Sequence, residues 1–368
     1  MDMNKLNKKI TVLMQTMPGA KDIFGGHMIQ LEKTKEYLCK LGVTVDYSEE
    51  LTPNLGKYDI VHLFDGRSWP QAINALKQRK LVAFTPIYLS LNLFDSYNKK
   101  TFNLETNVKR LHAKIAKLLL FLKDKEKFLN NYKRDIAERI NFENLLKYSH
   151  ILLPNSYLEA SQIEEDFNIS NNYHVVPNAA DISFKDAKPD EFIKKYKLKD
   201  FILCVARIAP RKNQLNLIKA IKRTNYHLVL IGPKHPDHLE YFRKCHRLFN
   251  RNVTYIEYIE HDLLPSAYSA AKVHILPSFN ETTGLSSLEA GLAGCNVVIT
   301  DRGYTREYFE DLAVYCNPED VSSIQDAIVK AYNTPKSDRL KNRILNNYTW
   351  EHTAEETYKA YMKVLDKR

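Results

Sequence analysis

The sequence is poor in the features that stabilise small secreted proteins and membrane proteins. Its five cysteines, Cys39, Cys204, Cys245, Cys295 and Cys316, lie far apart and form neither a C-x-x-C pair nor a metal-ligand spacing. We therefore expect reduced thiols and a cytoplasmic protein. The basic start of the chain, MDMNKLNKKITVLMQ, has too short an apolar run for a signal peptide, and no apolar stretch is long enough to span a bilayer.

Two sequence motifs of nucleotide-binding enzymes are also missing. A dinucleotide-binding dehydrogenase needs G-x-G-x-x-G after its first strand, and MPGAKDIFGG does not supply it. No loop carries an Asp-x-Asp pair that could hold Mg²⁺ or Mn²⁺ to a diphosphate, so we expect no metal and no other cofactor. The net charge of +10 favours acidic partners. Because the basic residues form no aromatic stacking face or known module, a nucleic-acid binder ranks last.

Short apolar runs alternate with helical patterns along nearly the whole chain. One set of expected strands covers residues 10–15, 43–47, 59–64, 81–86, 150–155 and 173–178, and a second covers 201–207, 227–232, 253–259, 273–278 and 296–300. Continuous apolar runs indicate strands covered on both faces, as in parallel sheets flanked by helices. We expect an α/β protein with two Rossmann-like domains facing each other across a cleft and the polar segment 179–192 as linker.

The segment from Val108 to Arg139 differs from the rest of the chain. Apolar residues recur in it at helical spacing, and it holds ten Lys or Arg against four Asp or Glu. A long basic amphipathic helix can lie on an anionic membrane surface. It can also pack its apolar stripe on the first domain and leave its lysines in water, which is the simpler interpretation.

The stretch PSFNETTGLSSLEAGLAG carries the strongest chemical pattern. Glu281 directly follows an expected strand end, where ligands bind in parallel sheets. Gly284 and Leu285 then begin a helix whose N–H groups and dipole can hold a phosphate. Glu289 lies five residues after Gly284, and its carboxylate can accept hydrogen bonds from the vicinal hydroxyls of a ribose. A phosphate, a ribose and a further polyol are the parts of a sugar nucleotide.

A second pattern, VARIAPRKNQLNLIKAI, places cations at another strand end. Arg207 ends the first strand of the second domain, and Lys212 follows beside Arg211 at a helix start. Two cations and a helix N-terminus suit a diphosphate, although solvated charge at a strand–helix junction would give the same residues.

These residues make the chain resemble the retaining GT-B glycosyltransferases of the family 4 type, most strongly from about Asn178 to Tyr361. The resemblance rests on an R-x4-K pattern, on an E-x7-E pattern after LPS, and on four further segments. LEAGLAGCNVVITD is similar to lEAmAcGtPVvas, VTYIEYIEHDLLPSAYSAA to v.flG.v....L..lY..A, VVPNAAD to viPNgvD, and YTWEHTAEETYKAY to the terminal fsWe..a segment. The first half matches more weakly, through FGGH and DIVHLF.

The resemblance implies roles for the matching residues. Arg207 and Lys212 would bind the donor diphosphate, and Glu281 would contact the donor sugar near its anomeric centre. The remaining matches would bind the donor: Glu289 the ribose, the amides of Thr283, Gly284 and Leu285 the phosphate and sugar, the backbone near Ile259 the base, and Gly25 and Gly26 the donor phosphate or the acceptor.

The chain departs from the family pattern at three places. Thr282-Thr283 stands where Gly-Phe is frequent, and Asn213 stands where a glycine usually follows R-x4-K. Where many members carry a histidine in the first domain, this chain has Pro86 and Tyr88. The acceptor side and the catalytic support are therefore open at this point.

We expect residues 1–180 to form an acceptor domain, residues 181–350 a nucleotide-sugar donor domain, and residues 351–368 a helix that returns to the first domain. The chain would move a hexose from a UDP- or GDP-sugar to a glycan or lipid-linked glycan, with retention and without metal. We expect this reaction in bacterial cell-surface polysaccharide assembly, carried out by a cytoplasmic protein that can lie peripherally at the inner face of the cell membrane. The alternative is a non-catalytic GT-B subunit that binds a sugar nucleotide or a partner glycosyltransferase.

Overall fold

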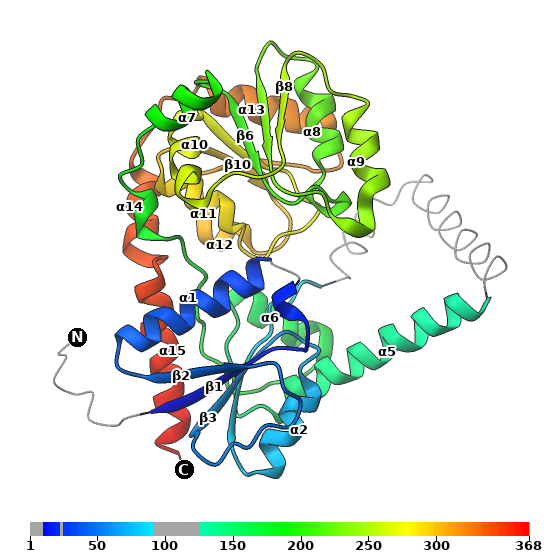
Figure 1. Cartoon of the computed structure of the whole chain (residues 1–368), viewed down its shortest axis with the longest axis vertical. Helices are drawn as coiled ribbons and strands as arrows, with labels where there is room; N and C mark the ends of the chain where they lie inside the picture. The colour runs from blue at the N-terminus through cyan, green and yellow to red at the C-terminus, as the bar shows by residue number, and fades with distance from the viewer. Residues whose placement is uncertain (1–9, 23–24, 91–124, 368) are drawn as a thin grey trace. The chain divides into compact units, whose positions relative to one another are not determined.

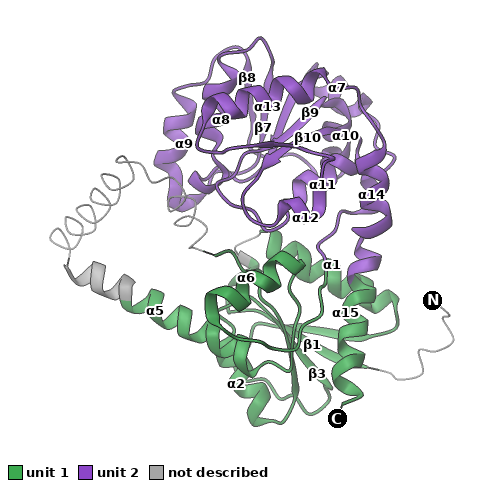
Figure 2. Cartoon of the chain, turned by 180° about the vertical axis from the view of Figure 1, so that it is seen from behind, with its two compact units in different colours: residues 1–176, 354–368 green, residues 177–353 purple. Residues whose placement is uncertain are grey.

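The computed structural model describes residues 10–22, 25–90 and 125–367 of the chain, the side chains of Asp22 and of residues 125–132 excepted. Figure 2 colours its two compact units, which comprise residues 1–176 with 354–368 and residues 177–353. The sequence placed the corresponding boundaries after residues 180 and 350. Each unit is built on its own parallel sheet, as expected for the two-domain α/β fold.

The first unit has the strand order β2-β1-β3-β4-β5 in its described part, with every pairing parallel (Figure 1). The strands are β1 (Thr11–Gln15), β2 (Thr44–Ser48), β3 (Ile60–Phe64), β4 (Leu81–Thr85) and β5 (Ile151–Leu152). The helices are η2 (Ala20–Asp22), α1 (Gly26–Lys40), α2 (Trp69–Lys77), α5 (Lys125–Tyr148), α6 (Tyr157–Phe167) and the end of α15 (Trp350–Leu365). Every residue of β3 and β4 is buried, which explains their uninterrupted apolar runs.

The second unit has the strand order β11-β10-β9-β6-β7-β8, again all parallel. The strands are β6 (Ile202–Val205), β7 (Leu228–Ile231), β8 (Val253–Ile256), β9 (Val273–Leu276), β10 (Asn296–Thr300) and β11 (Val314–Cys316). The helices are η3 (Ile182–Phe184), α7 (Asp190–Tyr196), η4 (Pro210–Lys212), α8 (Gln214–Ile221), η5 (Pro236–His238), α9 (Leu239–His246), η6 (His261–Leu263), α10 (Leu264–Ala270), α11 (Leu285–Leu292), α12 (Thr305–Phe309), α13 (Val321–Asn333), α14 (Arg339–Asn347) and the start of α15.

The core of the second unit has two layers, one on each face of the sheet. Leu203 of β6 packs in a cluster with residues of α10, α11 and α14. Its neighbours Ile202 and Cys204 point to the opposite face and pack in a cluster with α8 and α13. Since burying one such aliphatic side chain stabilises by about 1.5–3 kcal/mol, these two layers fix the helices against both faces.

Two sequence expectations about this region are wrong. Residues 173–178 form no strand, and Tyr173 makes only an isolated bridge with Leu152. Pro154 has no N–H with which to donate the next bond of the ladder. Residues 179–192 are not an irregular linker, because they contain η3 and the start of α7. The polar character of this segment comes partly from helix capping, since the Asp181 side chain accepts a hydrogen bond from the Ser183 N–H.

The expected basic helix can be followed only in part. Residues 108–124 lie outside the described residues, and the remainder belongs to α5, which extends away from the sheet of its unit (Figure 1). Residues 133–140 of α5 are all exposed. In the described part of the chain, no helix combines the length and the apolar character that crossing a membrane requires.

Candidate donor-binding site

The candidate site of the second unit lies at the carboxyl ends of its strands. β6 and β9 are neighbours in the sheet, so the segments that follow them meet at the same edge. Arg207 lies two residues after β6, Lys212 ends η4, and Glu281 follows β9 by five residues. The structure brings Lys212 and Glu281 into contact although 69 residues separate them.

Glu281 is buried and surrounded by cations. Its Oε1 accepts a hydrogen bond from Lys212 Nζ and lies 3.6 Å from Arg211 Nη1. Burial by itself would raise the pKa of Glu281, but Lys212 and Arg211 together hold this pKa below its usual value. Burial lowers the pKa of Lys212. Glu281 is therefore a carboxylate at neutral pH, and its charge is balanced by the same side chains that could meet a phosphate.

The loop that carries Glu281 is fixed by backbone contacts with Gly303 and Tyr304. The Tyr304 N–H donates to the Glu281 carbonyl at 3.0 Å. Gly303, at a φ of +88°, lies so close that an added Cβ would fall 1.9 Å from the Glu281 carbonyl oxygen. Only glycine can occupy this position, and the close approach sets the position of the Glu281 backbone.

The start of α11 is open to an anion. Gly284 precedes the helix at a φ of +81°, and no side chain caps the helix. Among the described residues, the N–H groups of Leu285 and Ser286 have no hydrogen-bond acceptor. Thr283, which stands where the family often has Phe, is buried and accepts a hydrogen bond from Asn178 Nδ2 at 3.2 Å. Such N–H groups at a helix start are suited to an anion, and here they lie next to Glu281 in the chain.

Glu289 lies one turn further along α11. The hydroxyl of Tyr268 donates to its Oε2 at 2.9 Å. Burial raises the pKa of Glu289 from its ordinary value of 4.5 to about 7, while the Tyr268 hydrogen bond opposes this rise and Asp181 adds to it. Glu289 thus lies on the same helix as the anion site and keeps one oxygen for a ligand.

The remaining predicted residues of this unit lie at other points of the same edge. The Arg207 carbonyl accepts from Gln214 Nε2 at 3.0 Å, and the Arg207 charge helps burial to lower the pKa of His235, which follows β7. Ile259 follows β8 and packs partly buried on the cluster that contains Tyr268. Asn213 replaces the usual glycine at a φ of +60°, and its Nδ2 binds the carbonyls of two loops.

In the first unit, Gly25 and Gly26 begin α1. The Gly25 carbonyl accepts from the N–H groups of Met28 and Ile29, and its φ of −162° is ordinary extended backbone. Tyr88, in the neighbourhood where many relatives have a histidine, has a structural role. Its hydroxyl donates to Asp166 at 2.6 Å and its N–H donates to Glu159 at 2.6 Å.

Sequence reasoning did not assign roles to four residues that contribute to the site. Arg211, Tyr268, Asn178 and Gly303 each contact a predicted residue or its backbone. The available signals were weak: Arg211 adjoins Lys212, and Tyr268 is the tyrosine of the L..lY..A segment. Nothing in the sequence distinguishes the glycine at 303 from other turn glycines.

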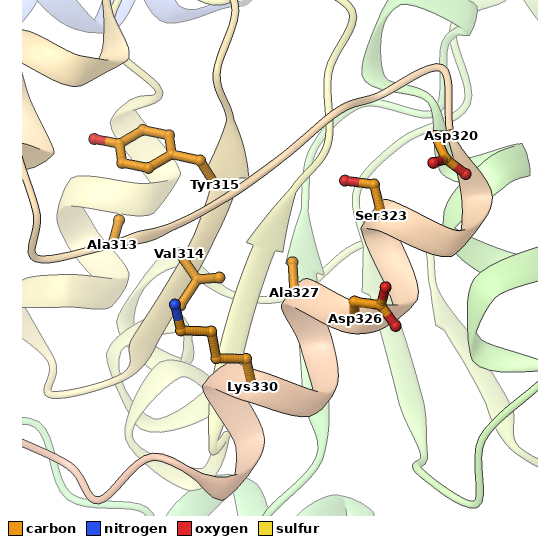
Figure 3. Close-up of a pocket in the computed structure, with 8 residues that line it drawn as sticks. All are labelled: Ala313, Val314, Tyr315, Asp320, Ser323, Asp326, Ala327 and Lys330. Atoms are coloured by element: carbon orange, nitrogen blue, oxygen red, sulfur yellow. The ribbon is translucent and has the colours of Figure 1, made fainter.

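A cavity of about 420 Å³ lies elsewhere in the second unit, between β11 and α13 (Figure 3). Ser323, Asp326 and Lys330 of α13 line it opposite Val314, together with Asp320, the N-cap of this helix. None of the predicted site residues lines this cavity, so it is separate from the candidate donor site. Among the described residues, no group of three or more His, Cys, Asp or Glu side chains could hold a metal ion.

Comparisons with known proteins show what the second unit and the whole fold are similar to. Residues 186–348 match the family model described as "Glycosyl transferases group 1". The O-antigen chain mannosyltransferase RfbU of Salmonella typhimurium is 24% identical over 228 residues, which cover 60% of this chain and 63% of that protein. The chain spans less than two thirds of the length of the curated relatives it matches first.

Solved structures match the chain over nearly its whole length. Sucrose-phosphate synthase from Thermosynechococcus elongatus superposes with a TM-score of 0.75 at 16% identity, covering 98% of this chain and 100% of that one. HepE from Anabaena, in complex with UDP and glucose, superposes with a TM-score of 0.64 at 14% identity, covering 97% of this chain and 98% of that one. These likenesses show the fold, and with the family match they confirm the resemblance to GT-B glycosyltransferases.

Proposed function

We propose that this chain, whose residues 186–348 match the group 1 glycosyl transferases and whose fold is GT-B, is a retaining hexosyltransferase that uses a nucleotide-diphosphate sugar. The observation that carries the proposal is the buried Lys212–Glu281 pair beside the uncapped start of α11. The cation and the helix start suit a diphosphate, and Glu289 on the same helix suits a ribose.

In this proposal the leaving diphosphate is stabilised by groups already held in position. As the bond between the anomeric carbon and the diphosphate oxygen breaks, negative charge grows on that oxygen. Lys212, Arg207 and the N–H groups at the start of α11 offset this charge. Glu281, kept ionised by Lys212 and Arg211, contacts sugar hydroxyls near the anomeric centre and favours the positive charge of the transition state.

Because protein cations carry the charge of the diphosphate, we propose that turnover needs no metal ion. Donor hydrolysis and transfer measured with and without EDTA test this point. Complete loss with the chelator, restored by Mn²⁺, would contradict it. Equal rates under both conditions support the assignment of Arg207 and Lys212 to the diphosphate.

The names of the curated relatives suggest the process in which the chain acts. Because the relatives include O-antigen chain mannosyltransferases, we propose transfer to a glycan in surface polysaccharide assembly. A thermal-shift screen of UDP- and GDP-sugars, followed by hydrolysis and transfer assays, tests the donor and the reaction. Nucleotide binding without hydrolysis or transfer would favour a non-catalytic GT-B subunit instead.

We further propose that the first unit docks on an anionic membrane through α5. Ile136 and Ile140 are 42% and 52% exposed, and Lys133, Arg134 and Arg139 accompany them. Each such cation adds about 1 kcal/mol near an anionic surface. Co-sedimentation with anionic vesicles should weaken as salt rises, and should weaken when these three cations become Gln. Changing Lys219, Lys222 and Lys244 to Gln is the matched control, and binding that is absent at low salt would contradict the proposal.

A further inference from the structure

The carboxylate of Glu289 is held by one fully buried phenol. Tyr268 lies on α10 and donates its hydroxyl to Glu289 Oε2 at 2.9 Å. Among the described residues, no other hydrogen bond reaches this carboxylate, so Oε1 keeps its acceptor capacity. The Glu289 side chain remains partly exposed, whereas Tyr268 is not exposed at all. One oxygen is thus tied to the core while the other stays available to a ligand.

Tyr268 cannot change its position without disrupting the core. Its ring packs edge-on against Phe184, with centroids 5.7 Å apart, and edge-on against His274, with centroids 5.6 Å apart. The same cluster includes Leu288, which adjoins Glu289 on α11. A hydroxyl held this rigidly aligns its acceptor, because the strength of a hydrogen bond depends steeply on its geometry.

We propose that Tyr268 is a positioning residue of the donor site, which orients Glu289 so that Oε1 meets the vicinal hydroxyls of the nucleotide ribose. This inference rests on the proposed function, since it concerns how the same site recognises a nucleotide. Tyr268 does not touch the nucleotide in this arrangement and acts only through Glu289. The arrangement matches the general rule that ligand-binding side chains are fixed by a second layer of hydrogen bonds.

The charges around Glu289 give the proposal a pH signature. Tyr268 faces the carboxylate from α10, Asp181 faces it from the segment before η3, and α14 presents the apolar Leu340 and Ile344 to the same helix at Gly291. Burial raises the pKa of Glu289 to about 7, and the Tyr268 hydrogen bond lowers it. Without the hydroxyl, the pKa of Glu289 rises further, and at neutral pH more of the protein carries a protonated Glu289 that accepts hydrogen bonds poorly.

The test compares Tyr268→Phe with Tyr361→Phe, which removes an equally buried phenol hydroxyl from the first unit. Binding of UDP and GDP is measured by calorimetry from pH 6 to pH 9. We expect Tyr268→Phe to weaken binding by about 3- to 10-fold at pH 7, the range of a typical net hydrogen bond, because Tyr268 acts on the nucleotide only through Glu289. This loss of affinity should become smaller as pH rises. It should also be smaller for 2′-deoxynucleotides than for ribonucleotides. Tyr361→Phe should bind as the unchanged protein does.

A second measurement reads Glu289 directly. In protein labelled with ¹³C at the glutamate carboxyls, the Glu289 signal is the one that Glu289→Gln removes. Its titration midpoint should move to higher pH in Tyr268→Phe and should stay in Tyr361→Phe. An unchanged midpoint, or a loss of affinity that is equal for ribo- and deoxynucleotides at every pH, would overturn the positioning role. If the unchanged protein binds no nucleotide, the proposed function fails, while the titration still decides whether Tyr268 controls Glu289.

Discussion

Both units bury a glutamate near the carboxyl ends of their strands, but the two carboxylates meet different partners. Glu159 of the first unit accepts hydrogen bonds from the N–H groups of Tyr88 at 2.6 Å and Asn155 at 2.7 Å. Glu281 of the second unit meets the side chains of Lys212 and Arg211. Backbone donors cannot move to a ligand, whereas side-chain cations can share their hydrogen bonds with one. Glu159 thus stabilises the fold of the first unit, whereas Glu281 has partners that a bound ligand could share.

The buried histidines differ in the same way. His62 on β3 and His274 on β9 are both fully buried, and burial lowers the pKa of each to about 3, so both are neutral. The ring nitrogens of His62 bind the hydroxyls of Tyr361 at 2.7 Å and Thr85 at 2.8 Å. Neither ring nitrogen of His274 has a partner among the described residues. His62 is therefore fully satisfied within the first unit, whereas the buried ring of His274 in the second unit is not.

Removing the cation that Glu281 depends on should have the largest effect. Lys212→Ala leaves the Glu281 carboxylate buried beside Arg211 alone and removes the donor that we propose for the diphosphate. We expect turnover to fall by about 10²–10³-fold, which corresponds to about 2.7–4 kcal/mol of transition-state stabilisation. Steady-state kinetics with the identified donor measure this loss.

The matched control breaks an exposed ion pair in the first unit. Lys57→Ala removes the 2.7 Å contact with Asp46, where both side chains are largely in water. Exposed pairs contribute little, so stability and turnover should both stay unchanged. Equal losses of turnover in the two variants would mean that Lys212 has no special place in the reaction.

Two glycines with similar backbone angles allow the stability cost of the close backbone contact with Glu281 to be measured separately from backbone strain. Gly42 in the first unit and Gly303 in the second have nearly equal φ angles of +87° and +88°. An added Cβ at Gly42 meets nothing within 4 Å, so Gly42→Ala should cost only the left-handed strain of about 1–2 kcal/mol. Gly303→Ala adds a collision with the Glu281 carbonyl oxygen at 1.9 Å, and should cost at least about 2 kcal/mol more. Urea unfolding of both variants checks the difference, and equal midpoint shifts would refute it.

The two histidines permit a similar comparison. His62→Leu leaves the buried hydroxyls of Tyr361 and Thr85 without their partner and should lower the free energy of unfolding by about 1–3 kcal/mol. His274→Leu breaks no hydrogen bond among the described residues, and should change stability by less than about 1.5 kcal/mol. Thermal and urea unfolding at pH 7 measure both. A larger loss for His274→Leu would show that its ring nitrogens have a partner in solution.

The sequence was informative where strand order alone decides a contact. β6 and β9 are adjacent in a parallel sheet, so residues that follow them must meet, and Lys212 and Glu281 were predictable as one site. The Tyr268–Glu289 contact was not predictable, because it depends on how α10 and α11 are rotated about their axes on the sheet. β11 was missed because its three residues are too short a run to give a periodic signal.

The smallest expected change in the free energy of unfolding comes from replacing a glutamate by glutamine, and it has opposite signs in the two units. Glu159→Gln places an amide NH₂ against one of two backbone N–H donors, and should destabilise by about 1–2 kcal/mol at any pH near neutral. Glu289→Gln keeps an oxygen that can accept from Tyr268 and removes a partly buried charge. It should therefore stabilise the fold where wild-type Glu289 is ionised.

The pH dependence of that stabilisation follows from the raised pKa of Glu289. Between its ordinary value of 4.5 and about 7, the native protein binds a proton at Glu289 more readily than the unfolded chain does. The contribution of Glu289 to the free energy of unfolding of the wild-type protein is therefore fully present below pH 4.5. It declines as pH rises and is lost above pH 7. Gln does not titrate, so the gain of Glu289→Gln should be absent near pH 4 and reach about 1–2 kcal/mol at pH 8, less than full burial would give because the side chain is partly exposed. Urea unfolding at both pH values measures it. A gain in stability that does not depend on pH, or a loss of stability at pH 8, would show that the folded protein does not disfavour the ionised form of Glu289.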